Sequence, residues 1–185
     1  HEIDMLKRRI GYKAARLINE GDTIILDAGI TTTYLASALR GRKGITVITN
    51  SLPVLAKLEG EEGITLISSG GVVRSESRSL VGPEAEAVFQ KLRADKAFIG
   101  GTGFSLDFGL SNTNIAEASI KQAMIGAARE IVLLADHIKI GVESLVNIVP
   151  VNSIHKLVTD VGVSAYDRLA FTRRGIDVII ARESS

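Results

Sequence analysis

Cysteine and tryptophan are both absent from this sequence of 185 residues. Without cysteine, disulfides and thiolate metal sites are excluded, and the composition fits a reducing cytoplasm. Long apolar runs are also missing, since no run reaches the roughly 20 residues that a membrane-spanning helix needs. No signal peptide is visible either. We therefore expect a cytoplasmic protein that makes no contact with a membrane.

An excess of charge of one sign is missing as well. The chain has 22 basic and 21 acidic residues, which gives a net charge of +1. This balance argues against the chain being the main surface for a nucleic acid. Short basic clusters occur at residues 7–9, 40–43 and 173–174, but no aromatic residues are interleaved with them. We interpret these clusters as solvated faces.

The composition that remains is that of a globular protein. Hydrophobic residues make up 45% of the chain and charged residues 23%, which is typical of one domain with a full core. We therefore assign residues 1–185 to a single domain. The chain begins at His1-Glu2 without an initiator methionine, so we expect a fragment with a further domain missing upstream.

Short apolar runs and amphipathic stretches alternate along the chain. The runs are rich in Val, Ile and Leu, as in strands that are buried on both faces of a parallel sheet. The expected strands are 23–26, 45–48, 64–67, 96–99, 131–135, 156–159 and 177–180. The expected helices are 2–19, 34–39, 52–58, 84–92, 116–127 and 165–173. This alternation predicts an α/β fold with a doubly wound, mostly parallel sheet.

One stretch breaks the alternation. Residues 70–82 begin with Gly70-Gly71, end with Gly82 and contain three serines. We expect a hairpin or a long loop here, and long loops in compact domains are often functional.

The most informative motif is Asp27-Ala28-Gly29-Ile30-Thr31-Thr32-Thr33, where the first expected strand turns toward a helix. Glycine and hydroxyl residues at such a turn leave backbone N–H groups free at a helix N-terminus, which favours a phosphate. The loop matches neither the GxxxxGK[ST] nor the GxGxxG pattern, so the anion is expected to be small, such as a sugar phosphate. A purely structural turn is the alternative interpretation.

Small or polar residues follow the other expected strands too. In open α/β sheets, ligands bind beyond the carboxyl ends of the strands, so these residues predict a polyol site at that edge. Lys139 is the candidate counter-charge for a phosphate, although a solvated lysine is the simpler interpretation. Lys121 lies four residues after Glu117, and the two either form an ion pair or line the mouth of the site. The residues expected to bind the ligand are Asp27, Gly29, Ile30, Thr31, Thr32, Asn50, Ser51, Gly70, Gly71, Gly100, Gly101, Thr102, Glu117, Lys121 and Lys139.

Catalytic groupings are scarce. We find no Ser-His-Asp grouping and no metal-ligand spacing, and we expect no cofactor. His137 and His155 are interpreted as surface or satisfied polar residues, and Asp27 and Asp95 as possible loop caps rather than acid–base groups.

Several motifs taken together resemble the C-terminal effector-sensing domain of DeoR-family bacterial transcriptional regulators. The resemblance spans nearly the whole chain. It rests on residues 27–32, Thr49-Asn50-Ser51, Gly70-Gly71, 79–82, 94–100, Glu117-Ala118 with 121–125, and Leu134-Ala135-Asp136 with Lys139 and Gly141. It implies a Rossmann-like fold similar to ribose-5-phosphate isomerase and glucosamine-6-phosphate deaminase. It also implies a phosphorylated sugar or related metabolite as effector, and an N-terminal winged helix-turn-helix, absent here, through which alone operator DNA would be bound.

The resemblance to the isomerases also bears on catalysis. Residues 135–139 resemble the isomerase segment that holds a phosphate-binding lysine, and Glu117 aligns with the isomerases' catalytic glutamate. Gly100 and Gly103 stand where the isomerases carry two aspartates, and glycine cannot transfer protons. Three positions depart from the family pattern: Ile30 replaces Ser or Thr, His137-Ile138 replaces small polar residues, and Ile140 replaces an aromatic residue.

Three hypotheses follow. The first is a regulator's sensor that binds a sugar phosphate without turnover, and it is the one we favour. The second is a sugar-phosphate isomerase or deaminase, supported by Lys139 and Glu117. The third is a scaffold that only oligomerises, supported by Ile30. A homo-oligomer is compatible with all three.

Overall fold

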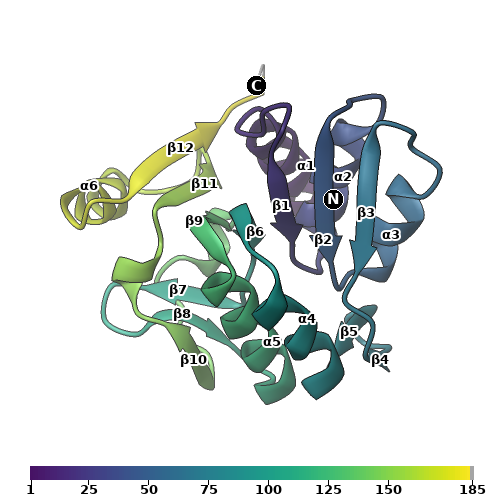
Figure 1. Cartoon of the computed structure of the whole chain (residues 1–185). Coiled ribbons are helices and arrows are strands. Elements are labelled where there is room, and N and C mark those ends of the chain that lie inside the picture. Colours follow the sequence, from purple (N-terminus) through teal and green to yellow (C-terminus); the bar gives the residue numbers. More distant parts are fainter. Residues whose placement is uncertain (184–185) are drawn as a thin grey trace.

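The computed structural model describes residues 1–183, which form three layers, with a parallel sheet between two layers of helices (Figure 1). Within these residues the sheet has seven strands in the order β12-β11-β9-β6-β1-β2-β3, and every pair in it is parallel. The strands are β1 (Thr23–Leu26), β2 (Ile45–Thr49), β3 (Ile64–Ser68), β6 (Ala94–Ile99), β9 (Ala128–Leu134), β11 (Lys156–Asp160) and β12 (Asp177–Ala181). The doubly wound parallel sheet expected from the sequence is confirmed.

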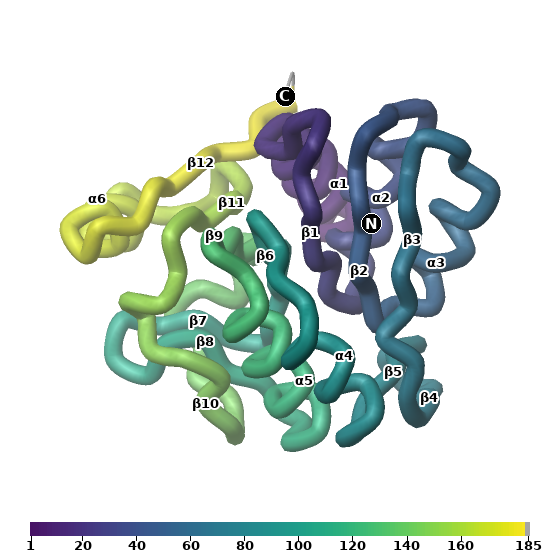
Figure 2. Tube along the Cα trace, viewed as in Figure 1, coloured from purple at the N-terminus to yellow at the C-terminus, as the bar shows by residue number. Residues whose placement is uncertain are grey.

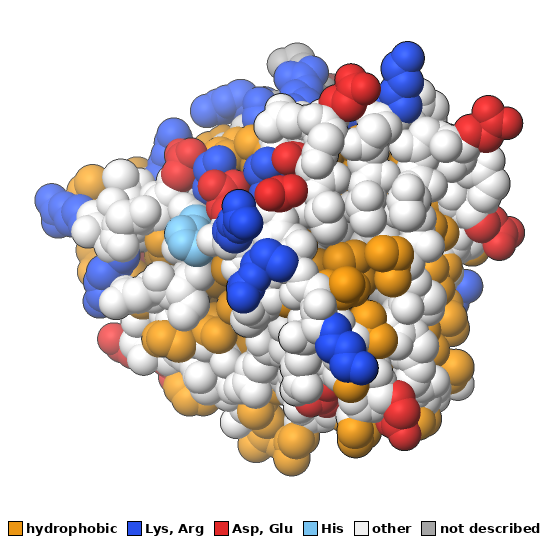
Figure 3. Space-filling view, in the orientation of Figure 1, with side chains coloured by type: hydrophobic (Ala, Val, Ile, Leu, Met, Phe, Trp, Pro, Cys, Tyr) orange, Lys and Arg blue, Asp and Glu red, His pale blue; other side chains and the backbone are white. Residues whose placement is uncertain are grey.

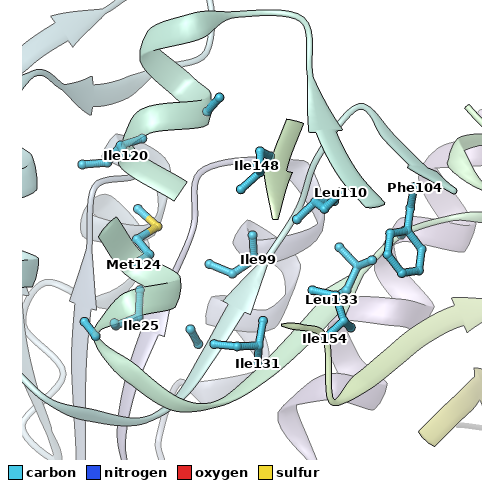
Figure 4. Close-up of a cluster of buried hydrophobic side chains, with 14 of the residues drawn as sticks. Ile25, Ile99, Phe104, Leu110, Ile120, Met124, Ile131, Leu133, Ile148 and Ile154 are labelled. Atoms are coloured by element: carbon cyan, nitrogen blue, oxygen red, sulfur yellow. The ribbon is translucent and has the colours of Figure 1, made fainter. Parts of the chain in front are cut away.

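Helices cover both faces of this sheet. They are α1 (Glu2–Ala15), α2 (Ile30–Leu39), α3 (Leu52–Leu58), α4 (Pro83–Lys91), α5 (Ile115–Gly126) and α6 (Ala165–Arg173). One hydrophobic cluster joins α1, α2 and α3 to the sheet, and a second joins α4 and α5 to the opposite face. Figure 4 shows the second cluster, in which Ile25, Ile99 and Ile131 of three neighbouring strands lie near Met124 of α5. The apolar stripes of α1 and α5 are therefore core packing.

Two element boundaries differ from the expectation. The helix expected over 34–39 begins at Ile30, so the threonines of the Asp27–Thr33 motif form its first turn. The helix expected over 2–19 ends at Ala15, because Leu17 N and Ile18 N bond the carbonyls three residues back, of Ala14 and Ala15, and tighten the chain into a turn.

A three-stranded antiparallel sheet was missed entirely by the sequence analysis. It is built from β7 (Gly103–Ser105), β8 (Gly109–Asn112) and β10 (Val146–Val149). Its strands have only three or four residues, and β10 is separated from β8 by 33 residues, so local periodicity does not reveal the pairing. It places Asn112, the last residue of β8, three positions before the start of α5.

The stretch 70–82 is a hairpin, one of the two forms expected. β4 (Val72–Arg74) pairs antiparallel with β5 (Ser79–Val81). Figure 2 shows the hairpin at the lower edge of the fold, beyond the carboxyl ends of β2 and β3. Two short 3-10 turns, η1 (His137–Lys139) and η2 (Val151–Ser153), complete the described elements.

The surface carries charges of both signs. Figure 3 shows lysine and arginine side chains interspersed with acidic ones over the face seen in Figure 1. Among residues 1–183, no helix is long and apolar enough to cross a bilayer.

Helix α1 packs against the first turn of α2 through Gly11. A methyl group added at Gly11 would lie 2.7 Å from the carbonyl oxygen of Thr31 and 2.8 Å from the nitrogen of Leu35. Both are backbone atoms, so the two helices would have to separate. The close approach of α1 thus fixes the position of the loop that precedes α2.

We predict that Gly11→Ala lowers the free energy of unfolding by about 1–3 kcal/mol, the usual cost of overpacking, despite alanine's better helix propensity. The matched control is Gly126→Ala in α5, where an added methyl group meets nothing within 4 Å. That variant should be neutral or slightly stabilised. Urea unfolding measures both, and a stabilised Gly11→Ala would contradict the close packing.

Candidate functional site

A cavity of about 220 Å³ opens at the carboxyl ends of β1 and β6. After β1 the chain builds one side of the sheet through β2 and β3, and it then returns to build the other side from β6 onward. The point between β1 and β6 is therefore the topological switch point of the sheet. Ligands of open α/β folds bind at such points because the strand-end loops diverge there. The lining residues are Lys7, Ala28, Gly29, Ile30, Thr31, Thr32, Arg74, Ser77, Gly100, Gly101, Thr102, Asn112, Thr113, Asn114, Glu117, Lys121, Leu134 and Lys139.

The N-terminus of α2 forms one wall of this cavity. Gly29 caps the helix with φ +148°, a conformation that favours glycine, and no side chain caps the helix. The first backbone bond of the helix runs from Thr33 N to the Gly29 carbonyl at 3.2 Å. The hydroxyls of Thr32 and Thr33 donate to the same carbonyl at 3.1 and 2.7 Å. Among the described residues, the N–H groups of Ile30, Thr31 and Thr32 therefore have no partner, and an anion fits there.

A buried ion pair lies behind this wall. The Asp27 side chain is fully buried, and its Oδ2 pairs with Lys121 Nζ, whose side chain is 5% exposed. The same oxygen accepts from Gly100 N at 3.0 Å, while Oδ1 accepts from Ala28 N at 2.9 Å. Asp27 thus ties the end of β1 to the end of β6 and to α5. It does not line the cavity, whereas Lys121 does.

Lys139 and Lys7 bring further positive charge to the cavity. Burial lowers the pKa of Lys139 below its ordinary value, while Asp136, with Oδ2 at 3.9 Å, raises it in part. The positive charges of Lys7 and Lys121 lower the pKa further. An anion in the cavity would relieve this repulsion. Lys7 was placed on a solvated face by the sequence analysis, but α1 brings it to the cavity.

Glu117 does not pair with Lys121, so the ion pair considered from their spacing is wrong. Its side chain is 7% exposed, and its Oε1 accepts from the hydroxyls of Ser77 at 2.5 Å and Ser79 at 2.7 Å. Arg74 NH1 lies 3.6 Å from the same oxygen. All three partners belong to the hairpin. Apart from the length of this segment, no pattern in the sequence indicated that it contributes to the cavity.

The segment before α5 adds side-chain amides that the sequence analysis also missed. Asn114 Oδ1 caps α5 by accepting from Glu117 N at 3.0 Å, and Asn112 Oδ1 accepts from Asn114 N at 3.0 Å. Since both oxygens are used, the NH2 groups are the donors left for a ligand. The sequence signal that could have revealed this turn is the helix-capping pattern Asn-x-x-Glu.

Besides Asp27, four residues from the sequence-based set do not line the cavity. Asn50 and Ser51 are fully buried beside the hairpin: Asn50 Nδ2 donates to the Leu80 carbonyl at 2.9 Å, and Ser51 Oγ caps α3. Gly70 and Gly71 form the turn before β4, where a methyl group on Gly71 would lie 2.8 Å from Ala85 Cβ. The structure therefore gives these four residues positions that support the hairpin.

The remaining candidates have local partners. His137 Nδ1 lies 2.7 Å from Asp160 Oδ1, and His155 Nδ1 accepts from Ile131 N at 2.8 Å, so both histidines are satisfied. Asp95 Oδ2 accepts from Thr23 N at 2.8 Å, as a cap at the start of β1.

Comparison with known proteins agrees with this architecture. The family described as "DeoR C terminal sensor domain" matches residues 4–161. This chain belongs to the DeoR family of transcriptional regulators. Among its relatives, the sensor domain is 35% identical to the HTH-type transcriptional regulator IolR of Bacillus subtilis over 153 residues, which cover 83% of this chain and 61% of IolR. It is 34% identical to the HTH-type transcriptional regulator GolR of Listeria innocua, over 95% of this chain and 69% of GolR.

The sensor domain spans about three fifths of the length of the first of these relatives. Solved structures add the fold. Ribose 5-phosphate isomerase from Plasmodium falciparum matches with a TM-score of 0.54 at 18% identity, over 74% of this chain and 53% of the isomerase. The family membership and the isomerase-like fold expected from the sequence motifs are both confirmed.

The buried pair yields a prediction for the sensor domain. Lys121→Met leaves the Asp27 carboxylate buried without a cation, so we expect the free energy of unfolding to fall by about 3–5 kcal/mol. The control is Lys156→Met, which breaks a partly exposed pair with Glu130 and should cost about 0–1 kcal/mol. Adding Asp27→Asn to Lys121→Met should recover part of the loss in urea unfolding. Equal losses for the two lysine variants would contradict a structural role for the pair.

Proposed function

We propose that this domain binds a phosphorylated sugar in the cavity, and that binding controls the operator affinity of a DNA-binding domain elsewhere in the full-length regulator. The observation that carries the proposal is the uncapped N-terminus of α2 facing the same cavity as Lys139 and Lys7. A helix N-terminus with adjacent lysines suits a small dianion such as a phosphate monoester.

The rest of the cavity supports a polyol attached to that phosphate. The wall opposite α2 offers the Glu117 carboxylate, the Ser77 and Thr102 hydroxyls and the amide groups of Asn112 and Asn114. Sugar hydroxyls both donate and accept hydrogen bonds, so a mixed wall of this kind suits them. The regulators in the same family support a role in transcription control. Such a sensor would act in the cytoplasm, and we expect it to form a homo-oligomer.

A sugar-phosphate isomerase is the second candidate, because the fold resembles those enzymes and the sequence motifs align Glu117 with their catalytic glutamate. Enzymatic proton transfer between two carbons of a sugar needs a suitably placed base and further groups that stabilise the charge. Glu117 is the one carboxylate among the described residues that line the cavity. A methyl group at Gly103 would lie 2.4 Å from the Val142 carbonyl oxygen, so the backbone there leaves no room for an aspartate. These observations favour binding without turnover.

We predict that a matching sugar phosphate stabilises the domain, whereas its unphosphorylated sugar does not. At about a hundred times its Kd, a ligand adds about 2.7 kcal/mol, which raises Tm by about 5–10 °C for a domain of this size. A thermal-shift panel of paired sugars and sugar phosphates measures this. Turnover of a sugar phosphate that is lost in the Glu117→Ala variant would support the isomerase. The absence of a Tm shift with every sugar phosphate would support a scaffold that only oligomerises.

The affinity for the phosphate should depend on pH through Lys139. The lysine binds a dianion best when protonated, and its pKa in the free protein is lowered, so binding raises that pKa. We therefore predict that the affinity is constant from the phosphate's own pKa of about 6 up to the pKa of Lys139 in the unliganded domain. Above that pKa, the affinity should decline by up to about tenfold per pH unit. Titration calorimetry at several pH values measures it.

Lys139→Met should weaken binding by roughly tenfold or more and remove the alkaline decline. Lys91→Met, at the exposed end of α4, is the control and should keep both. An alkaline decline that is the same in Lys139→Met would assign it to another group.

A further inference from the structure

The tip of the hairpin, residues 74–78, lies between two hollows. Arg74 and Ser77 line the cavity described above. On the other side, Glu76, Ser77 and Arg78 line a second cavity of about 510 Å³, together with residues of α2 and α3. Few apolar side chains can pack against a segment placed in this way, and such segments open at low free-energy cost.

The two strands of the hairpin are held very differently. β5 is buried and fixed to the segment after β2: Leu80 N donates to the Asn50 carbonyl at 2.8 Å, and Leu52 N donates to the Arg78 carbonyl at 3.0 Å. β4 is exposed, with Val72 and Val73 at 62% and 54%. It follows Gly70 and Gly71, whose φ angles of +63° and +116° favour glycine. β4 and the tip can therefore move while β5 stays in place.

Apart from the backbone bond between Arg78 and Leu52, where the tip joins β5, a single carboxylate oxygen fastens the tip to the body of the domain. Glu117 Oε1 accepts from Ser77 and Ser79 and lies 3.6 Å from Arg74 NH1. The remaining bonds of Arg74 stay within the tip, with Ser77 Oγ at 2.9 Å and Glu76 Oε2 at 3.0 Å. Glu117 Oε2 accepts no hydrogen bond from residues 1–183, although Glu117 lines the cavity. It is thus free to bind a ligand hydroxyl while Oε1 holds the tip.

We propose that residues 74–78 form a lid that closes on the sugar part of the effector, with Glu117 as its latch. The inference rests on the proposed function. A ligand hydroxyl on Glu117 Oε2 and further hydroxyls on Arg74 and Ser77 bridge the lid to α5. Inorganic phosphate, bound at the N-terminus of α2, reaches the anion site without making this bridge. Closure of the lid therefore depends on the sugar part of the ligand, whereas binding at the N-terminus of α2 depends on the phosphate.

Trypsin cleavage tests the lid directly, because Arg74 and Arg78 are both cleavage sites within it. Where opening is fast, the cleavage rate follows the population of the open form. Ser77→Ala removes the lid's own hydroxyl bond to Glu117 and Glu117→Gln removes the charge, so either variant should raise the rate at these sites by about tenfold. Glu84→Gln, an exposed acidic residue on α4, is the charge-matched control and should leave the rate unchanged. Unchanged rates in both latch variants would overturn the latch.

Measuring cleavage with and without ligand distinguishes a lid from a purely structural hairpin. A sugar phosphate that raises Tm in the panel should slow cleavage at Arg74 and Arg78 at least tenfold, whereas inorganic phosphate at saturation should leave cleavage within about twofold of the free protein. A sugar phosphate that raises Tm without slowing cleavage would overturn the lid and leave the proposed function standing. No stabilisation by any sugar phosphate would overturn the proposed function, and the lid with it.

Discussion

The buried ion pair between Asp27 and Lys121 is the constraint on which the site depends. A fully buried carboxylate is unfavourable unless it is paired and hydrogen-bonded, and Asp27 obtains its partners from α5, from the end of β6 and from its own neighbour Ala28. The carboxylate can be satisfied only when β1, β6 and α5 meet at the switch point of the sheet. The same arrangement sets the loop at Gly29, from which α2 begins with its amides free. The free amides on which the proposed anion site rests are therefore positioned by the neutralisation of Asp27.

The cavity divides into two chemically distinct ends. The α2 end carries free amides and lysines, and its positive charge is only partly balanced by Asp136. The hairpin end carries Glu117, with its positive partner Arg74 engaged by two carboxylates. The proposed ligand, with a phosphate at one end and hydroxyls at the other, complements both, so the polarity of the cavity predicts its orientation. Under this proposal, the α2 end and the exposed tip of the hairpin contact different parts of one molecule.

Much of the fold could be predicted because its signals are local. Continuous Val, Ile and Leu runs mark strands buried on both faces, and their alternation with helices predicts a parallel sheet. The sequence analysis missed the small sheet of β7, β8 and β10 because its strands are very short and β10 pairs with a strand far along the chain. Most of the expected binding residues also line the cavity, since strand ends in such a fold converge on one edge. Lys7, Arg74 and Ser77 were missed because they reach the cavity from a helix and a hairpin outside those strand ends.

The sequence by itself determined the class of the fold and the turn at Gly29, because each depends on residues that are neighbours in the chain. It determined the family through motifs that follow one another along nearly the whole chain. The tertiary structure alone decided the pairing of the charges. Spacing offered a pair of Glu117 with Lys121 as one of two alternatives, but burial pairs Lys121 with Asp27, 94 positions away, and turns Glu117 to the hairpin. Electrostatic partners in a protein interior are chosen by distance in space and by the cost of leaving a buried charge alone. Neither quantity can be read from positions along the chain.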